Sequence, residues 1–257
     1  MTYLILIKKE AVEAFRTYRF FIISILFLLF GLAAPATAKL LPEIIKNLGT
    51  GESLMIQVPT PTVYDSWLQF FSNHSQMTLI IFMITFGQSL GKELSDGTMV
   101  LLVTKGINRN TAMLAKFSYQ AGLWLAGLAG SALITYLYNF VLFSGENQPV
   151  GTILWYVFSL WLFGVFFIGV SQLGQVLLPK ASGGLLLSFL AIAGLLILNI
   201  FSAVEKVSPL NLIGVTSEGL KNGIDIRSSL LPLLITLGLV ILAVCCAGLR
   251  FKKVPVY

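Results

Sequence analysis

The segment from Gly91 to Lys116 carries the residues best suited to chemistry at an interface. It reads GKELSDGTMVLLVTKGINRNTAMLAK, with the five apolar residues Met99–Val103 preceded by acidic and followed by basic side chains. Acidic groups early and basic groups late favour a short helix through its dipole. Five residues are too few to cross a bilayer. The pattern predicts either a helix on the membrane surface or an apolar knob with a charged rim that docks into another protein.

Residues for catalysis or metal binding are sparse. His74 is the single histidine and has no second ligand type near it in the sequence, so no metal site is expected. Cys245 and Cys246 are adjacent in an apolar run and are interpreted as apolar residues, with reversible acylation as the alternative. The sequence has no Gly-x-x-x-x-Gly-Lys-Ser/Thr loop, so we expect neither an ATP site nor a cofactor in this chain.

Composition indicates a membrane protein. Of the 257 residues, 56% are hydrophobic and 11% are charged, and the mean hydropathy is +0.88. An average soluble protein has about 25% charged residues, so the bilayer is the natural solvent for this chain. The net charge of +6 is spread in short clusters between apolar runs. That pattern is typical of cytoplasmic loops near lipid headgroups, and no nucleic-acid partner is expected.

Six apolar runs predict an all-α, polytopic protein, a single transmembrane domain over residues 1–257. A span needs about 17–25 mostly apolar residues. The runs lie at residues 20–36, 77–90, 117–144, 152–178, 181–204 and 230–249. The second run is short, so we expect it to begin earlier, near Trp67, or to be sheltered by its neighbours.

Basic residues predict that both termini are cytoplasmic, because lysine and arginine are enriched on that side. Twelve of them fall on one side of the six spans and five on the other. The twelve are Lys8, Lys9, Arg16, Arg19, Lys92, Lys105, Arg109, Lys116, Lys180, Arg250, Lys252 and Lys253. A cleavable signal peptide ending at Ala38 is the competing interpretation. Glu10 and Glu13 in the basic stretch favour a retained first span.

Two segments outside the spans have apolar patterns of their own. Residues 1–19 predict an amphipathic interfacial helix, either an anchor or the elbow helix of a transporter, with apolar residues at helical spacing: Leu4, Ile7, Ala11, Phe15 and Tyr18. Residues 37–76 predict an external loop with Pro59 and Pro61. Its aromatic cluster, Trp67, Phe70 and Phe71, is interpreted as a short helix on the outer interface, with a cap over a substrate path as the alternative.

The polar residues within the runs are neutral. No ionisable side chain lies away from the ends of a span, which argues against a carrier coupled to protons or sodium. We expect the neutral residues to form helix–helix hydrogen bonds rather than to line a pathway: Gln88, Gln120, Gln172, Gln175 and Asn199. Gly130 and Gly164 are among the small residues expected to permit close helix contact.

The loop between the second and third runs resembles the signature of ABC-2 type permeases, the membrane subunits of ATP-binding-cassette exporters. The resemblance rests on Glu93-x-x-x-Gly97-Thr98, Leu101-Leu102, Thr104-Lys105-Gly106-Ile107-Asn108-Arg109 and Lys116-Phe117. It departs from the family pattern at Gly106, where proline is usual, at Ala115, where glycine is frequent, and at Asn108, where serine is frequent. The interfacial helix, six spans and internal termini also match the family plan.

The resemblance implies a coupling helix that sits in a separate nucleotide-binding subunit, which binds ATP and Mg²⁺. Its contact residues would be Glu93, Gly97, Thr98, Met99, Leu101, Leu102 and Arg109. It also implies pairing with a second copy or a homologous permease in a cell membrane, interpreted as prokaryotic. The cargo would be an amphipathic, lipid-like or peptide molecule, or an ion. A membrane scaffold or assembly factor without transport is the alternative.

Overall fold

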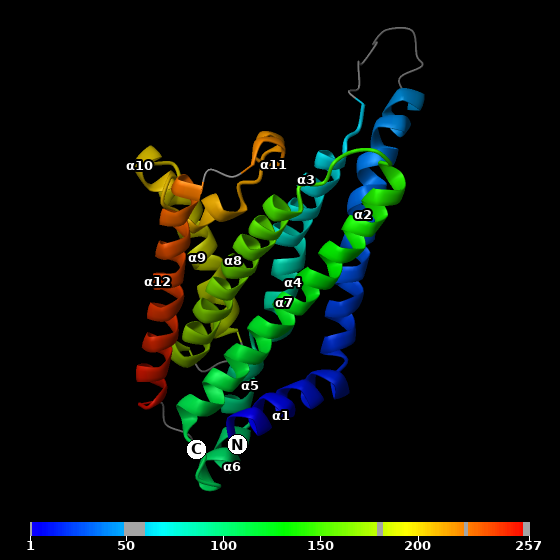
Figure 1. Ribbon diagram of the computed structural model, residues 1–257. Helices are drawn as coiled ribbons and strands as arrows, with labels where there is room; N and C mark the ends of the chain where they lie inside the picture. Colours follow the sequence, from blue (N-terminus) through cyan, green and yellow to red (C-terminus); the bar gives the residue numbers. More distant parts are fainter. Residues whose placement is uncertain (1, 49–59, 179–181, 224–225, 254–257) are drawn as a thin grey trace.

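Every regular element that the structure describes is helical, which confirms the all-α prediction. The structure is a computed structural model and describes residues 2–48, 60–178, 182–223 and 226–253 (Figure 1). In chain order the elements are α1 (Thr2–Arg16), α2 (Arg19–Leu48), α3 (Val63–Asn73), the π-helix η1 (His74–Thr78), α4 (Leu79–Phe86), α5 (Ser89–Ser95), α6 (Thr98–Thr104), α7 (Arg109–Leu142), α8 (Val150–Leu177), α9 (Gly183–Leu198), α10 (Ser202–Glu205), the 3-10 helix η2 (Pro209–Ile213), α11 (Ser217–Asn222) and α12 (Ile226–Phe251).

Four described helices are long and apolar enough to cross a bilayer, which indicates a membrane protein. They lie at Arg19–Pro42, Arg109–Leu142, Val150–Leu177 and Ser229–Phe251. These helices match the first, third, fourth and sixth predicted runs, of which the third and fourth end one or two residues beyond the helix. The fifth prediction was too long, because α9 ends at Leu198 and a turn precedes α10. At 16 residues, α9 is apolar but shorter than the four others.

The second predicted run belongs to a longer helical stretch that begins earlier, as expected, and much of the described part of the predicted loop at residues 37–76 is helical. α3, η1 and α4 follow one another from Val63 to Phe86, so the helix begins before the apolar run does. Asp65 fixes this start, because its Oδ2 accepts the backbone N–H of Thr62 at 2.8 Å. On the other side of the loop, α2 continues to Leu48. Pro59 lies outside the described residues.

α2 contains a proline that the structure accommodates with a side chain of α7. Pro35 has no N–H, so it leaves the carbonyl of Gly31 without its helical donor. Thr135 donates its hydroxyl to that carbonyl at 2.8 Å. One turn earlier, Ser131 donates to the carbonyl of Phe27 at 2.8 Å. These two bonds join α2 to α7 in what we call the α2–α7 seam.

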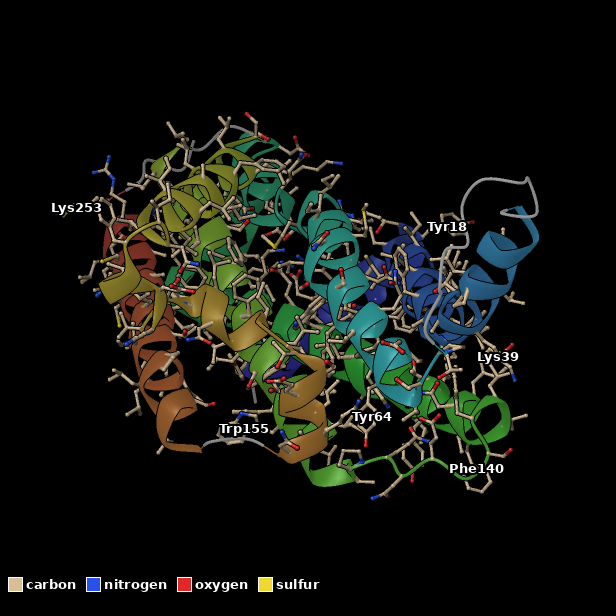
Figure 2. The ribbon with its side chains drawn as sticks, turned by 90° about the horizontal axis from the view of Figure 1, so that it is seen from above. Tyr18, Lys39, Tyr64, Phe140, Trp155 and Lys253 are labelled. Carbon is tan, nitrogen blue, oxygen red and sulfur yellow. The ribbon has the colours of Figure 1, made fainter. Side chains whose placement is uncertain are left out.

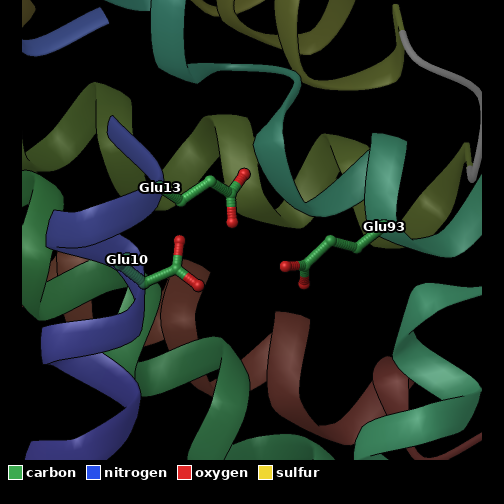
Figure 3. Close-up of side chains that lie close together, drawn as sticks. All are labelled: Glu10, Glu13 and Glu93. Atoms are coloured by element: carbon green, nitrogen blue, oxygen red, sulfur yellow. The ribbon is translucent and has the colours of Figure 1, made fainter. Parts of the chain in front are cut away.

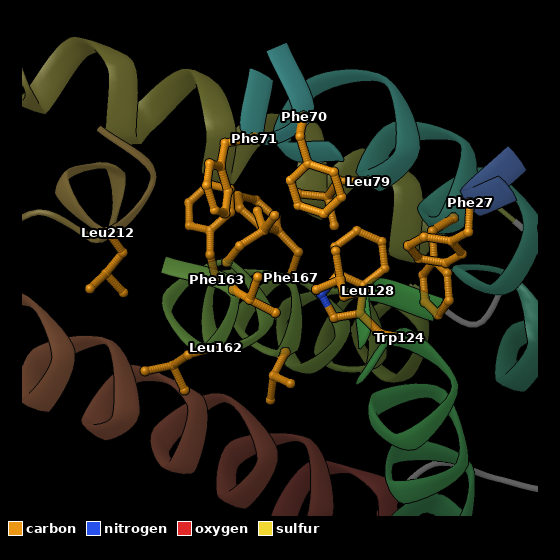
Figure 4. Close-up of a cluster of buried hydrophobic side chains, with 14 of the residues drawn as sticks. Phe27, Phe70, Phe71, Leu79, Trp124, Leu128, Leu162, Phe163, Phe167 and Leu212 are labelled. Carbon is orange, nitrogen blue, oxygen red and sulfur yellow. The ribbon is translucent and has the colours of Figure 1, made fainter. Parts of the chain in front are cut away.

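The core of the bundle is aromatic and surrounds α8. In α8, 72% of the most apolar stretch is buried, against 28% or less in the other three candidate spans. α7 and α12 pack on α8, and α2 packs on α7 (Figure 2). Trp67, Phe70 and Phe71 are at most 3% exposed and belong to this core, and Figure 4 shows Phe70 and Phe71 within it. The prediction that they rest on the outer interface is therefore wrong, because the three side chains are buried among other aromatic rings inside the bundle.

His74 also lies inside the bundle rather than in an external loop. It is fully buried, with Nδ1 2.8 Å from the carbonyl oxygen of Phe70 and Nε2 2.9 Å from the hydroxyl of Ser131. The ring packs against Phe27, with 5.6 Å between the ring centroids. The sequence placed His74 outside the predicted spans, whereas here it lies in the continuous helical stretch that includes the second apolar run. The histidine joins η1 to the α2–α7 seam.

Two glycines interpreted alike from the sequence have different roles. A Cβ on Gly164 would lie 2.2 Å from Nε1 of Trp124, a ring with no exposed surface, whereas one on Gly130 would meet no atom within 4 Å. We expect Gly164→Ala to lower the free energy of unfolding by about 1–3 kcal/mol through overpacking. Gly130→Ala should stay near the wild type. Melting temperatures of the detergent-solubilised variants test this, and equal effects of the two would contradict it.

Candidate functional site

The loop with the permease-like signature folds into two short helices, α5 and α6, rather than one. Gly97 separates them with φ of 70°, in the left-handed region that glycine tolerates best. Gly106 ends the pair with φ of 79°, which a proline ring cannot adopt. The side chain of Asn108 then accepts the N–H of Asn110 at 3.0 Å and caps α7. The glycine in place of the family's proline is thus required by the local backbone.

α6 lies at the same end of the molecule as α1 and the last residues of α12 (Figure 1). Its apolar residues face in different directions. Met99 is fully buried and packs in a small core with Leu90, Met113 and Phe251. Leu102 is half-buried against the same core, and Leu101 is 63% exposed. In the predicted apolar knob, Met99 therefore faces inward and anchors α6, whereas Leu101 faces outward.

The other residues of the predicted contact set are spread around this pair of helices. Thr98 donates its hydroxyl to the carbonyl of Glu93 at 3.3 Å, which ties α6 to α5. Arg109 is the first residue of α7 and is half-buried. Glu93 is 8% exposed, so its side chain faces the bundle rather than a partner. Of the set, Leu101 is the apolar side chain most open to a second protein.

Five charged residues converge beside α5 and form what we call the charged cluster: Lys9, Glu10, Glu13, Glu93 and Lys116. Lys116 Nζ lies 2.7 Å from Glu10 Oε2 and 3.1 Å from Glu93 Oε1. Lys9 Nζ lies 3.0 Å from Glu10 Oε1 and 3.2 Å from Glu13 Oε2, and also contacts Glu93. The cluster ties α1 to α5 and α7.

The charged cluster explains which face of α1 packs on the bundle. Leu6, Glu10 and Ala14 recur one turn apart and are buried. The apolar side predicted from the sequence is largely open, with Leu4 70% and Phe15 45% exposed. The face with Glu10 packs on the bundle, so the opposite, apolar face is open to lipid, as in a helix at a membrane interface. The sequence signal for the buried face was the pair of acids in an otherwise basic segment.

The three carboxylates of the charged cluster also have the spacing of a metal site. Ligand oxygens of Glu10, Glu13 and Glu93 lie within 4.8 Å of one another (Figure 3). The ammonium groups of Lys9 and Lys116 already contact these carboxylates, in the positions that a cation would take. The two ammonium groups offset two of the three negative charges and bridge all three carboxylates, so the arrangement implies an ionic tie between helices.

Three of the predicted polar residues lie beside α5, and a fourth, Gln172, bonds to α7. Gln175 of α8 accepts the N–H groups of Leu90 and Gly91 at 2.7 and 2.8 Å. These N–H groups have no partner within the first turn of a helix. Gln120 donates to the hydroxyl of Ser89 at 3.1 Å. Gln172 donates to the carbonyl of Met113 at 3.5 Å, and Gln88 is the half-buried residue before α5. Gln175, Gln120 and Gln172 thus bond between helices, and Asn199 lies apart at the end of α9.

The charged cluster shifts the pKa values of its groups outside the spans. Burial raises the pKa of the Glu13 carboxyl, but the charges of Lys116 and Lys9 outweigh it and hold the pKa below its usual 4.5. Burial lowers the pKa of the Lys9 amine, but its hydrogen bond to Glu93 and the nearby carboxylates raise it above its usual value. Both groups are therefore charged at neutral pH.

Acid should weaken the docking of α1. A carboxylate with a depressed pKa adds stability above its unfolded pKa and loses it as the pH falls through the folded pKa. Lys9 has a raised pKa, so its contribution is lost only as the pH rises through that value. We expect the difference in melting temperature between the wild type and Glu13→Gln to shrink from about pH 7 to about pH 3. A difference that is constant with pH would contradict this.

The chain matches no known protein-family model, and no curated protein matches its sequence.

Proposed function

We propose that this chain is the permease subunit of an ABC-2 type exporter in a prokaryotic cytoplasmic membrane. Six crossings with both termini in the cytoplasm would use the four long helices together with α3–α4 and α9. The permease-like loop, with its acid, Gly97 and Thr98, supports this proposal. So does the position of α1, α6 and the end of α12 at one end of the bundle (Figure 1).

The observation that carries the proposal is the exposed Leu101 on an anchored helix. Met99 buries one side of α6 in the small core, while Leu101 is 63% exposed on the outside. Asp96 and Lys105 give this surface a charged rim, because both are exposed. An apolar centre with a polar rim is the usual anatomy of a protein interface. A separate ATPase subunit that binds ATP and Mg²⁺ would dock here.

A movement of that subunit would reach the spans through α5. Gln175 holds the start of α5 to α8, and Lys116 joins Glu93 of α5 to α7. Because these contacts are buried, a displacement of α6 would be passed to two central helices instead of being absorbed by a loose loop. A second copy of the chain, or a homologous permease, would complete the pathway for the cargo.

An apolar groove supports an amphipathic or lipid-like cargo. It lies between α7 and α8, has a volume of about 570 Å³ and includes Trp67 of α3 in its lining. Among its other lining residues are Leu125, Ala132, Ile153 and Val157. Pockets that hold small molecules have volumes of about 300–1,000 Å³. The apolar part of such a cargo would fit this groove.

Purification of the tagged chain from its native membrane in mild detergent tests the proposal. We expect a stoichiometric ATPase with a P-loop in the same complex, identified by mass spectrometry. The isolated chain should hydrolyse no ATP. An oligomer of the chain that contains no ATPase would favour the scaffold alternative, and robust ATP hydrolysis by the pure chain would refute a two-polypeptide transporter.

A further inference from the structure

A second apolar groove lies between the first turns of α7 and the last turns of α12, at the end of the bundle that also holds α6 (Figure 1). We call it the α7–α12 groove. It has a volume of about 350 Å³, and its lining includes Asn110, Met113 and Leu114 of α7 and Cys245, Gly248 and Leu249 of α12. Apart from the amide of Asn110, these side chains are apolar or, at Cys245, weakly polar. Such a lining is suited to a hydrocarbon chain.

The floor of the α7–α12 groove is buried and its sides are exposed. Gly248 and Met113 are buried, and a Cβ on Gly248 would lie 3.6 Å from Met113 Cε, so the two helices are in contact there. Leu114 and Leu249 are exposed residues of the same lining. A hydrocarbon chain of the surrounding bilayer can therefore enter the groove from the side.

The groove lies close to the headgroup layer, because it lies near the ends of both helices. α12 ends at Phe251, and the lining residues of α12 from Cys245 onward lie within about 10 Å of that end at 1.5 Å per residue. On α7, Asn110 is the second residue of the helix. Its NH₂ group can donate to an ester or phosphate oxygen. The polar end of the lining is thus the end nearer the headgroups.

Lys252 continues the line of groove residues toward the headgroups. It follows Gly248 by four residues and Leu249 by three, which is the spacing of one face of a helix. The N–H of Lys253 donates to the carbonyl of Arg250 at 2.9 Å, so the chain continues to turn after the helix ends. The ammonium group of Lys252 is therefore placed above the groove rather than on the opposite side of α12.

The chain that follows the groove is basic and its charges are not neutralised. Arg250, Lys252 and Lys253 are exposed and form no ion pair with a described residue. No residue that lines the groove is charged. Arginine and lysine are the usual partners of phosphate oxygens.

The acidic side chains at this end of the bundle lie elsewhere. Glu13, Glu93 and Asp96 line a separate hollow beside α1 and α5, and none of them lines the α7–α12 groove. Glu10 is held by Lys116 in the charged cluster, with 2.7 Å between Oε2 and Nζ. The positive charge beside the groove is therefore unbalanced, which favours a lipid with a net negative charge over a zwitterionic one.

We propose that the α7–α12 groove binds an anionic phospholipid from the leaflet at this end of the bundle. One acyl chain would lie on the floor formed by Met113 and Gly248. The phosphate would lie toward Lys252 and Lys253, with the NH₂ group of Asn110 toward the ester or phosphate oxygens. Basic sites between membrane helices bind anionic headgroups in this way. The site needs no ATPase partner, so it can hold or fail independently of the proposed export function.

Lipid retention by the full chain tests the charge at the site. The chain is placed in nanodiscs with equal shares of phosphatidylglycerol and phosphatidylcholine, extracted in mild detergent and examined by native mass spectrometry. We expect phosphatidylglycerol to be retained over phosphatidylcholine. The double variant Lys252→Gln/Lys253→Gln should lower this preference by about tenfold. Lys8→Gln/Lys92→Gln removes two exposed lysines outside the groove and is the matched control, which should keep the preference.

A second pair of variants tests the groove without changing a charge. Cys245 is exposed and lines the groove, so Cys245→Trp should fold, fill the groove and lose the retained phosphatidylglycerol. Cys245→Ser leaves the groove open and should retain it.

Three results would overturn the site. Equal retention of the two lipids by the wild type would mean that negative charge is not recognised. An equal loss in the two double variants would mean a general attraction of basic residues to anionic lipid. Full retention by Cys245→Trp would mean that the lipid binds outside the groove.

Discussion

Leu101→Glu is expected to abolish association of the chain with its ATPase subunit and to leave membrane insertion unchanged. Leu101 is 63% exposed on α6, so a glutamate there is hydrated in the isolated chain. In the proposed complex the same carboxylate would be buried in an apolar contact without a cationic partner, which costs several kcal/mol. Co-purification of the ATPase with the tagged variant, at matched levels in the membrane, measures the effect.

Leu249→Glu is the matched control for this prediction. Leu249 is 66% exposed near the end of α12, on the same end of the bundle but outside the loop. It should retain the ATPase. Leu102→Glu is also expected to lose the ATPase, but Leu102 packs against the small core, so that variant also destabilises the chain. Normal ATPase recovery with Leu101→Glu would exclude α6 as the docking helix.

Lys116→Met is expected to lower the free energy of unfolding by about 3–5 kcal/mol, the cost of removing one partner of a buried ion pair. The Lys116 side chain is 1% exposed and lies between Glu10 and Glu93. Without it, three carboxylates would share Lys9, with Arg19 at 3.9 Å from Glu13. For a chain of this size the melting temperature should fall on the order of 10 °C.

Two further variants separate charge from packing. Lys105→Met removes an exposed lysine from the loop after α6 and should change stability by less than about 0.5 kcal/mol. Adding Glu10→Gln to Lys116→Met removes one of the unpaired carboxylates and should restore part of the lost stability. If the double variant is as unstable as Lys116→Met alone, the lysine acts through its aliphatic stem and not through its charge.

Much of the fold could be predicted because the signals are local. Long apolar runs predicted the helices that begin at Arg19, Arg109, Val150 and Ile226, and each is present. The E-x-x-x-G-T pattern picked out the loop in which Gly97 takes a positive φ. The second helical stretch was expected to begin near Trp67, and it begins one turn earlier because a capping box at Thr62 and Asp65 starts the helix at Val63.

The charged cluster could not be predicted, because its members are far apart in the chain. Lys9 and Glu93 are 84 residues apart, and Glu10 and Lys116 are 106 residues apart. Lys116 stands one residue before the predicted third span, where it was interpreted as a basic residue on the cytoplasmic side and as part of the permease-like pattern, with no ionic partner. The sequence around Lys116 does not show that the ammonium group of this lysine has almost no contact with water.

The sequence by itself determined that this is an all-helical membrane protein and which loop is its most distinctive segment. Both follow from residue type and spacing within single segments, since hydropathy and helical period act over one or two turns. Only the tertiary structure decided that Met99 faces inward and Leu101 outward, that His74 is buried against Ser131, and that α1 docks through Glu10. Those outcomes depend on which helix lies opposite, and the free energy that selects them comes from contacts between segments distant in the chain.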